Sequence, residues 1–410
     1  MKNFNLNVKV GNDTGNSELD MIINGEEIRQ ANVYGRVVGG INLEELDQDK
    51  FIENLENNLV IGVCDLEGIE SGDYYIGNYT LKSKARVRNI EVGAGNKKVD
   101  SDVCFINTLG LISAYAVKQS YKENKDIKDI TVKIDMAGAL PITQYSKAEG
   151  QKFADKFMNT EHRVTVKTPK QNYYVTLKFE FARVIPEGVT TTFALISDDS
   201  ERLFKFYNKQ VAFNLKKNRN DDLYKEELHT RYFQEKERRI LHVAIGEGTT
   251  EFPITEGIIY DPNFVEGANN GVGHAIKTAL PLFNKKFRTK YSRQMYSDVV
   301  KDKEHKYHED ALEYLSTPLE DEAEEIYRKA VDELEKANNE VDVIMIYGGG
   351  SILMREFLEP RLEDVARRIR SKILYVDKEH AVTLESKGLY NFTNSAIFKV
   401  LKEKRLASAK

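Results

Sequence analysis

Hydrophobic and polar residues alternate in two segments of the sequence that share one layout. In the first segment, residues 6–10 and 19–23 alternate on either side of a glycine-containing turn, and the pair Asn24-Gly25 follows, which is a strong signal for a β-hairpin. In the second segment, residues 241–245 alternate before another glycine-containing turn. A period of two predicts strands with one buried face. Because the two layouts begin about 230 residues apart, we interpret them as copies of one α/β domain with a cleft between them.

Helical periodicity is clearest in two other segments. In residues 101–118, apolar side chains recur three and four positions apart after Ser101 and Asp102, which are favoured at a helix N-terminus. Residues 317–338 repeat this spacing, and we expect Pro318 at the first helical position, where its missing N–H costs nothing.

Further strands are predicted at residues 130–134, 173–184 and 341–347, the last being almost continuously apolar and therefore suited to a buried parallel strand. Residues 198–239 differ from all of these because they are rich in charge and contain neither glycine nor proline. We expect this segment to form surface helices of an insertion.

The chain has 410 residues, of which 41% are hydrophobic and 30% are charged, which is typical of a globular protein with two or three domain cores. Its 60 Lys and Arg against 65 Asp and Glu argue against a dedicated nucleic-acid-binding protein. No apolar run reaches the roughly 18 residues of a membrane helix, and no signal peptide is evident, so we expect a cytoplasmic protein without membrane contact. Cys64 and Cys104 are expected to be small buried side chains.

Glycines gather in short clusters at the ends of the apolar runs. The first cluster contains Asp13, Thr14, Gly15, Asn16 and Ser17. Glycine lets backbone amides approach an anion, Asn and Ser add donors, and the carboxylate could hold a hydrated magnesium ion. Taken alone, an ordinary hairpin turn explains the same residues.

The second cluster repeats this chemistry with Gly246, Glu247, Gly248, Thr249 and Thr250. Two such hairpins that face each other could hold a polyphosphate from both sides.

A third cluster, Gly348, Gly349 and Gly350, ends the run that begins at Ile344, and we expect a helix to open at Ser351. Three glycines leave a flat backbone surface for a purine or ribose, and the helix N-terminus adds free amides. The dinucleotide motif GxGxxG is absent, and a close strand-to-helix crossing is the alternative explanation.

Two further motifs carry candidate residues. Gly271 belongs to GANNGVG, which precedes a predicted helix containing Lys277, although a glycine-rich loop with a helix cap explains it equally well. Glu187 follows a strand and a proline in RVIPEGV, where a carboxylate could position a water molecule for attack on a terminal phosphate. By itself, Pro-Glu-Gly is only a turn.

In this order along the chain, the motifs resemble those of the actin-like ATPases, most closely the ParM group of plasmid-segregating proteins. GNDTGNS resembles the first phosphate loop, IGEGTTEF the second, GANNGVGHAIKTAL the loop and helix near the nucleotide, and VIMIYGGGSILM the adenosine motif. DMAGALPITQYSK and RVIPEGV fall where the group has its Leu-Pro and Pro-Glu segments. The ordered set spans residues 8–394, nearly the whole chain.

The resemblance implies an α/β fold of two ribonuclease H-like domains with a nucleotide cleft between them. Domain I would comprise residues 1–186, with a C-terminal helix at about 385–410 packing back onto it, and domain II residues 187–384. It further implies Mg2+ with ATP or GTP as cofactors, self-assembly into filaments, and a DNA-binding adaptor protein that links the filament to plasmid centromere DNA.

The resemblance also assigns roles to residues. Asp13 would hold the metal through water, residues 15–17 would bind the phosphates, and Glu187 would position the hydrolytic water. Residues 246–249 would wrap the other side of the phosphates. Residues 348–351 would border the adenosine, and Lys277 would lie near the base or ribose.

Two departures from the group pattern affect these roles. The second loop normally opens with an aspartate, but Ala244 stands there, and we expect Glu247 to take over its duty. Where a lysine commonly follows the first loop, this chain has Glu18 and Asp20. The phosphate charge would then need another partner, such as the metal, backbone amides or a lysine from elsewhere.

The favoured function is an ATPase that segregates plasmid DNA, in which ATP promotes polymerisation and hydrolysis promotes disassembly. The alternatives are another bacterial actin-like cytoskeletal filament and a small-molecule kinase of the same superfamily, which would need an additional carboxylate near the loops. A chaperone-like ATPase would require a separate peptide-binding domain after the core, and the roughly sixty residues after the third glycine cluster leave no room for one. A membrane-bound relative would require an amphipathic membrane segment, and none is convincing here.

Overall fold

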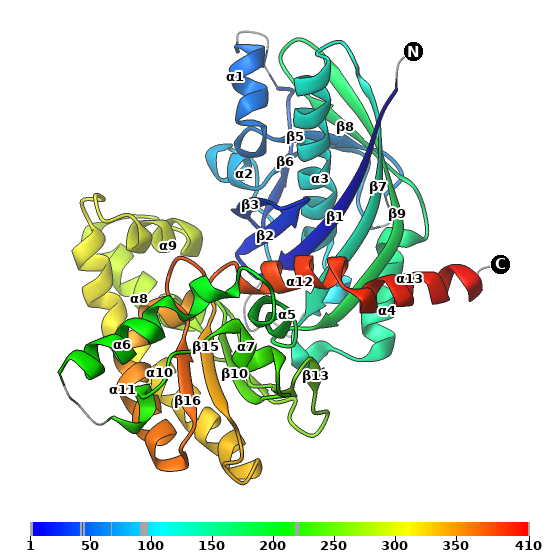
Figure 1. The fold of residues 1–410 in the computed structure, drawn as a ribbon. Helices are drawn as coiled ribbons and strands as arrows, with labels where there is room; N and C mark the ends of the chain where they lie inside the picture. Colours follow the sequence, from blue (N-terminus) through cyan, green and yellow to red (C-terminus); the bar gives the residue numbers. More distant parts are fainter. Residues whose placement is uncertain are drawn as a thin grey trace. The chain divides into compact units, whose positions relative to one another are not determined.

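The computed structural model describes residues 3–41, 43, 46–66, 68–90, 97–217 and 221–408. The chain forms two compact units, each considered by itself (Figure 1). Unit 1 comprises Met1–Leu140, Gln144–Ile185 and Ser386–Lys410, and unit 2 comprises Pro141–Thr143 and Pro186–Glu385.

The described part of unit 1 contains a nine-stranded sheet. Its strands, in spatial order, are β3 (Glu26–Ala31), β2 (Glu18–Ile23), β1 (Asn3–Thr14), β7 (Asp129–Leu140), β9 (Asn172–Pro186), β8 (His162–Lys167), β5 (Val60–Val63), β6 (Gly72–Ile76) and β4 (Tyr34–Arg36). β1 and β7 are parallel, whereas β1, β2 and β3 form the antiparallel meander predicted from the sequence. Asn24 and Gly25 both have positive φ, as a tight β2–β3 turn requires.

Helix α3 (Asp102–Glu123) lies across this sheet and supplies much of the core of unit 1 (Figure 1). Its predicted start is confirmed, because the Ser101 side chain accepts a hydrogen bond from the Val103 N–H. The other helices of the unit are α1 (Gln48–Glu53), α2 (Asn78–Lys82) and α4 (Lys147–Met158). Cys104 is buried in α3, but the expectation for Cys64 is wrong, since that thiol is exposed just after β5 ends.

The C-terminal helices α12 (Leu384–Asn394) and α13 (Ala396–Ser408) pack on unit 1 (Figure 1). The backbone of α12 approaches β1 so closely that a Cβ atom at Gly11 would lie 2.4 Å from the amide nitrogen of Tyr390. Lys402 of α13 binds Asp135 at 2.7 Å and Glu180 at 3.0 Å. The last two residues of the predicted 385–410 helix lie outside the described residues.

Unit 2 is built on a second sheet, described here with seven strands. These are β10 (Arg239–Ile245), β11 (Thr250–Glu251), β12 (Ile254–Glu256), β13 (Ile259–Tyr260), β14 (Gly267–Ala268), β15 (Val343–Tyr347) and β16 (Lys372–Tyr375). β10, β15 and β16 are parallel neighbours. Every residue of β15 is buried, which confirms the predicted buried parallel strand.

The second half of unit 2 contains the helices α8 (Val272–Phe287), α9 (Arg293–Lys301), α10 (His308–Lys336) and α11 (Gly349–Ile369). The predicted start of α10 at Pro318 is wrong, because the helix begins ten residues earlier and contains that proline. Ala311 and Leu315 are buried and extend the same apolar face as Leu319. Their burial outweighs the one backbone hydrogen bond that proline removes.

The segment 198–239 forms helices, as predicted, but it does more than cover a surface. Helix α5 (Thr191–Leu195) precedes the segment. The segment itself contains the 3-10 helix η4 (Ser200–Phe204), α6 (Lys205–Lys216), the 3-10 helix η5 (Asp222–Tyr224) and α7 (Thr230–Gln234). α6 and η5 contact β16, the edge strand of the sheet, so this segment shields an edge that would otherwise be open (Figure 1).

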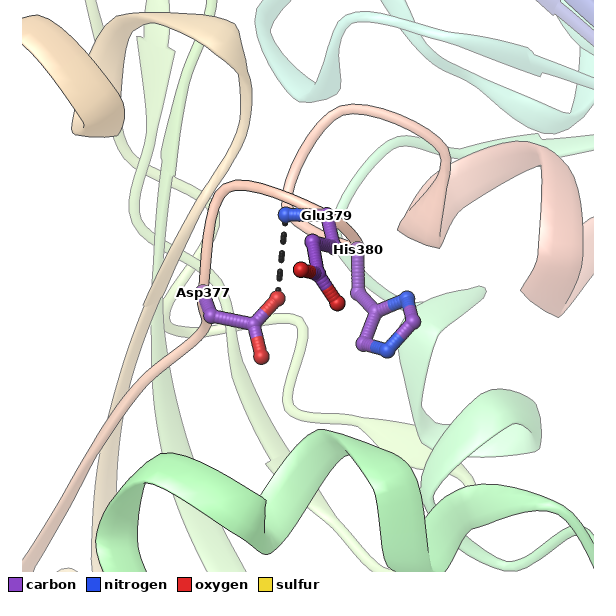
Figure 2. Close-up of side chains that lie close together, drawn as sticks. All are labelled: Asp377, Glu379 and His380. Atoms are coloured by element: carbon purple, nitrogen blue, oxygen red, sulfur yellow. Dashed lines mark hydrogen bonds between the residues drawn. The ribbon is translucent and has the colours of Figure 1, made fainter.

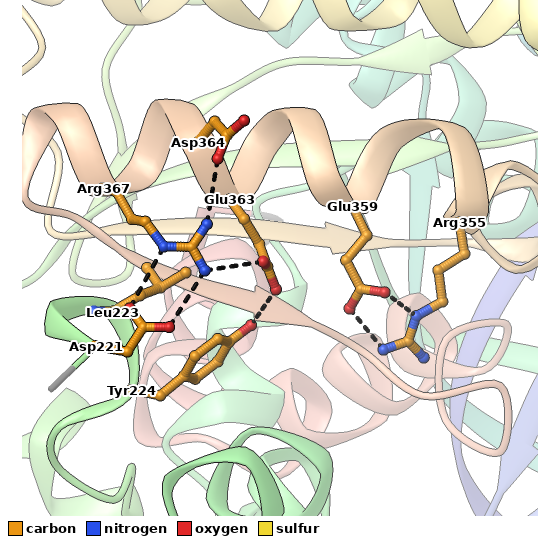
Figure 3. A network of polar contacts seen from close by, with 8 residues as sticks. All are labelled: Asp221, Leu223, Tyr224, Arg355, Glu359, Glu363, Asp364 and Arg367. Carbon is orange, nitrogen blue, oxygen red and sulfur yellow. Dashed lines mark hydrogen bonds and ion pairs between the residues drawn. The ribbon is translucent and has the colours of Figure 1, made fainter. Parts of the chain in front are cut away.

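Polar contacts fix the same segment to α11 (Figure 3). Arg367 of α11 lies 3.3 Å from Asp221 and 3.1 Å from Glu363. The Tyr224 hydroxyl donates to Glu363 at 2.7 Å. The segment is therefore an integral part of unit 2.

Candidate functional site

The first candidate loop is the turn between β1 and β2. Asp13 and Thr14 end β1, and the turn that follows leads into β2 at Glu18. A Cβ atom at Gly15 would lie 2.8 Å from the Glu18 carbonyl oxygen, so the tight turn requires glycine. The structure thus brings residues 13–17 together at one end of the sheet.

Two buried asparagines hold this turn. The Asn32 side-chain amide donates to the Gly15 carbonyl at 2.7 Å, and its backbone N–H donates to the Ser17 carbonyl at 2.7 Å. Asn107 of α3 in turn donates to the Asn32 side-chain oxygen at 2.9 Å. The sequence analysis did not identify these residues, although an asparagine within the apolar face of a predicted helix was a usable signal.

Carboxylates surround the first loop. Asp20 lies directly opposite Asp13 in the β1–β2 pairing and is only 5% exposed. Burial raises the pKa of Asp20 well above its usual value, Arg29 lowers it, and Asp13 raises it. The Arg29 guanidinium lies 3.2 Å from Asp20 and also binds Glu18. Arg29 thus occupies Glu18 and Asp20, and Asp13 is the carboxylate of this loop that fits the water shell of a hydrated Mg2+ ion.

The second candidate loop follows β10. The Gly246 N–H donates to the Thr249 carbonyl at 2.9 Å and closes the turn. Thr250 donates to the Asn270 carbonyl at 2.8 Å, and the His274 ring nitrogen lies 3.0 Å from the Gly248 carbonyl. The loop is therefore tied to the segment that precedes and begins α8.

That segment touches the second loop backbone to backbone. The Gly273 N–H donates to the Glu247 carbonyl at 2.7 Å. A Cβ atom at Gly271 would lie 2.5 Å from the same oxygen. Close packing thus accounts for Gly271. Lys277, one turn into α8, is exposed and makes no ion pair with any residue that the structure describes.

The third glycine cluster meets the second loop from the other side. A Cβ atom at Gly350 would lie 2.4 Å from Ile245 Cγ2, and Gly348 has a φ of 92°. Helix α11 begins at Gly349, so the predicted start at Ser351 is wrong by two residues. Ser351 is buried and donates its hydroxyl hydrogen bond to the Gly348 carbonyl at 2.8 Å. Gly349 and Gly350 are therefore the first residues of the helix.

Gly349 differs from its two neighbours. It is exposed, and a Cβ atom there would have nothing within 4 Å. A close strand-to-helix crossing therefore accounts for Gly348 and Gly350 but not for Gly349. The open space over its backbone, at the N-terminus of a long helix, fits a flat ligand with negative charge nearby.

Glu187 lies half-buried in the turn after β9. Glu385 holds this turn, because its carboxylate accepts a hydrogen bond from the Gly188 N–H at 2.8 Å and another from the Thr190 hydroxyl. The Tyr347 hydroxyl donates to Glu385 at 3.2 Å. Burial raises the pKa of Tyr347, and the charges of Glu385 and Glu187 raise it further, so its hydroxyl remains protonated. Neither Glu385 nor Tyr347 was predicted from the sequence as part of the site.

A buried histidine supports the same turn. His242 of β10 lies 3.1 Å from the Thr191 hydroxyl and 2.9 Å from the Thr255 hydroxyl. Thr191 donates to the Gly188 carbonyl at 2.8 Å. Burial lowers the pKa of His242 to about 3, so the ring is neutral at pH 7 and serves as a hydrogen-bonding support.

An ion pair holds the Glu247 side chain. Its Oε1 lies 3.0 Å from Nε of Arg293, the first residue of α9. Its Oε2 is buried and accepts no hydrogen bond from the described residues. Arg293 lies 46 positions further along the chain, so no local pattern predicted its contact with Glu247.

The loop after β16 brings together Asp377, Glu379 and His380, whose potential ligand atoms lie within 4.8 Å of one another (Figure 2). Asp377 already accepts the Glu379 N–H at 3.0 Å, which closes an Asx turn. The loop also supports the third glycine cluster, because the Ala381 carbonyl accepts the Gly348 N–H at 2.9 Å. We therefore assign this loop a structural role.

No protein-family model matches the sequence. No curated protein matches it either. Within the described residues, no helix is both long and apolar enough to span a membrane.

Solved structures, in contrast, match nearly the whole chain. The actin-like protein Alp7A superposes with a TM-score of 0.66 at 15% identity, covering 99% of this chain and 100% of that one. Ta0583, an archaeal actin homologue, gives 0.62 at 14% identity over 94% and 99% of the two chains. ParM of Bacillus thuringiensis with ATP gives 0.59 at 14% identity over 98% and 100%. The chain has the α/β fold of the actin-like ATPases.

Proposed function

We propose that this protein is an actin-like ATPase that assembles into filaments when it binds Mg-ATP and disassembles after hydrolysis. The observation that carries the proposal is the convergence on the end of β10 of the three predicted glycine segments that belong to unit 2, at residues 246–250, 271–273 and 348–350. Ordinary packing explains most of these glycines, but it leaves the open backbone at Gly349 unexplained. The fold and the ATP-bound ParM structure among its neighbours support the same conclusion.

In this proposal the two loops bind the phosphates of one nucleotide. Residues 15–17 and 246–250 offer backbone amides and hydroxyls, as phosphate oxygens require. Residues 348–351 border the adenosine, with Lys277 near the base or ribose. Asp13 would hold the metal through water, whereas Asp20, opposite it in the β1–β2 pairing, is bound by Arg29. The metal, when bound, neutralises the charge that develops on the phosphates.

Hydrolysis depends on Glu187 in this account. Its carboxylate positions the attacking water, and Glu385 fixes the turn that carries it. Glu247, the second predicted catalytic residue, acts on the metal's water shell from the other loop.

We further propose that the filament moves plasmid DNA in the cytoplasm through a DNA-binding adaptor. The formal charge of −5 agrees with indirect DNA contact, since a protein that grips DNA directly usually has a basic surface. Another actin-like cytoskeletal filament is the alternative assignment.

Nucleotide binding and turnover test the enzymatic part. Purified full-length protein should bind a fluorescent ATP analogue with Mg2+ and release phosphate from ATP, and GTP in a parallel assay gives the base preference. Absence of both binding and phosphate release for both nucleotides would overturn the proposal.

A further inference from the structure

We infer that Arg293 is a positioning residue for the metal side of the nucleotide site, and that it holds Glu247 so that Oε2 can accept a hydrogen bond from a metal-bound water. The inference rests on the proposed function. Arg293 and Glu247 both belong to unit 2, and the resemblance that suggested the nucleotide loops assigns no role to Arg293.

The ion pair between the two side chains is well placed. Arg293 Nε lies 3.0 Å from Glu247 Oε1, and the two side chains are only 21% and 13% exposed. A pair so shielded from water is weakly screened by salt, unlike most surface ion pairs. The Ser292 hydroxyl accepts the Met295 N–H at 3.2 Å and caps α9, which fixes the backbone from which Arg293 extends.

Both the backbone and the side chain of Glu247 pack against the start of α8. Its carbonyl accepts the Gly273 N–H at 2.7 Å. Its side chain then crosses the start of α8, where a Cβ atom at Gly273 would lie 2.9 Å from Glu247 Cγ. A larger residue at position 273 would therefore displace this side chain. The carboxylate reaches Arg293 along one fixed path, so its second oxygen also has a fixed position.

That second oxygen lacks a donor. Oε2 is buried and accepts no hydrogen bond from the described residues. A buried carboxylate oxygen without a donor is unfavourable, so a donor is expected when the site is filled. Magnesium keeps several of its waters when it binds, and those waters are donors.

Glu247 is the carboxylate within the turn of the second loop. Ala244 occupies the position where an aspartate was expected, and the other acid of the loop motif, Glu251, lies in β11 and is only 1% exposed. Arginine suits the supporting role, since its guanidinium stays charged and holds a carboxylate in one orientation. Outer-shell partners of this kind orient the groups that contact the metal or its waters.

The test compares how much Mg2+ strengthens nucleotide binding. Affinity of the full chain for a fluorescent ATP analogue is measured with Mg2+ and with EDTA, and the ratio of the two is the readout. We expect Arg293→Ala to reduce this ratio about tenfold or more, the usual loss for an outer-shell partner. Glu247→Gln should cause a similar loss, and Arg293→Lys should recover part of it. The double variant should lose no more than either single variant, because the pair acts as one unit.

Lys118→Ala provides the matched control. It removes the Lys118–Glu56 ion pair, whose side chains are similarly shielded at 18% and 27% exposure and which lies in unit 1 on α3. It should leave the ratio unchanged, and thermal unfolding of each variant checks that it is folded.

The inference is overturned if folded Arg293→Ala or, should that variant not fold, Glu247→Gln keeps the wild-type ratio. A buried structural water would then satisfy Oε2. Failure of the proposed function looks different, because the wild-type protein itself would bind no nucleotide under either condition.

Discussion

Gly348 lies against Ile245 so closely that a Cβ atom on the glycine would be 2.4 Å from the isoleucine carbonyl oxygen. This contact joins the end of β15 to the end of β10, where the second loop begins. Packing against Ile245 therefore requires glycine at positions 348 and 350, whereas it does not require glycine at position 349.

Replacing Gly348 should therefore destabilise the fold. Gly348→Ala meets both the steric conflict and a φ of 92°, so we expect a loss of about 2 kcal/mol or more in the free energy of unfolding. Chemical denaturation measures it. A variant as stable as the wild-type protein would contradict the close approach.

Gly349→Ala should give the opposite pattern. Its Cβ atom has free space and alanine favours helices, so the free energy of unfolding should change by less than about 1 kcal/mol. Nucleotide affinity should fall about tenfold, or roughly 1.4 kcal/mol, because the methyl group occupies the proposed ligand surface. Unchanged affinity, measured by fluorescence titration, would remove Gly349 from the site.

Glu187→Gln should slow phosphate release about 100-fold, the lower end of the range for a general base, while Mg-ATP-dependent assembly persists. Malachite-green detection of phosphate and pelleting measure the two properties separately. Glu385→Gln is the companion variant: it weakens the support of the same turn and should reduce stability as well as turnover. Wild-type turnover by Glu187→Gln would withdraw its water-positioning role.

Asn32→Ala should loosen the first loop. It removes two side-chain hydrogen bonds and leaves the Gly15 carbonyl and the Asn107 amide without their partner, so we expect about 2 kcal/mol lower stability. Nucleotide affinity should fall as well, because residues 15–17 lose their fixed geometry. Hydrogen exchange at the amides of this turn, compared between variant and wild type, reports the loosening directly. Unchanged exchange would show that Asn32 does not hold the turn.

His242 gives a pH dependence of known sign. Its pKa is about 3 in the folded chain against an ordinary value of 6.5, so the unfolded chain binds the extra proton between these values. The neutral, buried His242 ring therefore contributes fully to the free energy of unfolding above pH 6.5, and this contribution is lost as the pH falls toward 3. Denaturation of wild type and His242→Gln at pH 7, 6 and 5 should show a steeper decline for wild type, by at most about 1.4 kcal/mol per pH unit. Parallel declines would contradict it.

Local patterns predicted the elements whose partners are close in sequence. The alternation around Asn24-Gly25 predicted the β1–β2–β3 meander, and the apolar run at 341–347 predicted β15. Both predictions succeeded because the pattern of apolar residues within a strand indicates which of its faces are buried. The start of α10 was wrongly predicted because it, too, was inferred from local sequence alone. Proline favours the first turn of a helix, but the packing of Leu315 and Ala311 keeps the helix continuous before Pro318.

The supports of the candidate site could not be read in this way. Asn107 reaches Asn32 across 75 positions, and Glu385 reaches Gly188 across 197. Each looks like an ordinary polar residue in its own segment. Only the folded chain shows that their side chains are buried and committed to particular backbone groups of the loops.

Sedimentation measures whether the protein assembles into filaments. Purified full-length protein is centrifuged over a wide concentration range with Mg-ATP, with Mg-ADP and without nucleotide, and light scattering follows the same samples in time. We expect polymer in the pellet above a threshold concentration with Mg-ATP, little with Mg-ADP or without nucleotide, and scattering that decays as ATP is consumed. Protein that stays in the supernatant under all three conditions, at every concentration, would show that the chain does not form nucleotide-dependent filaments.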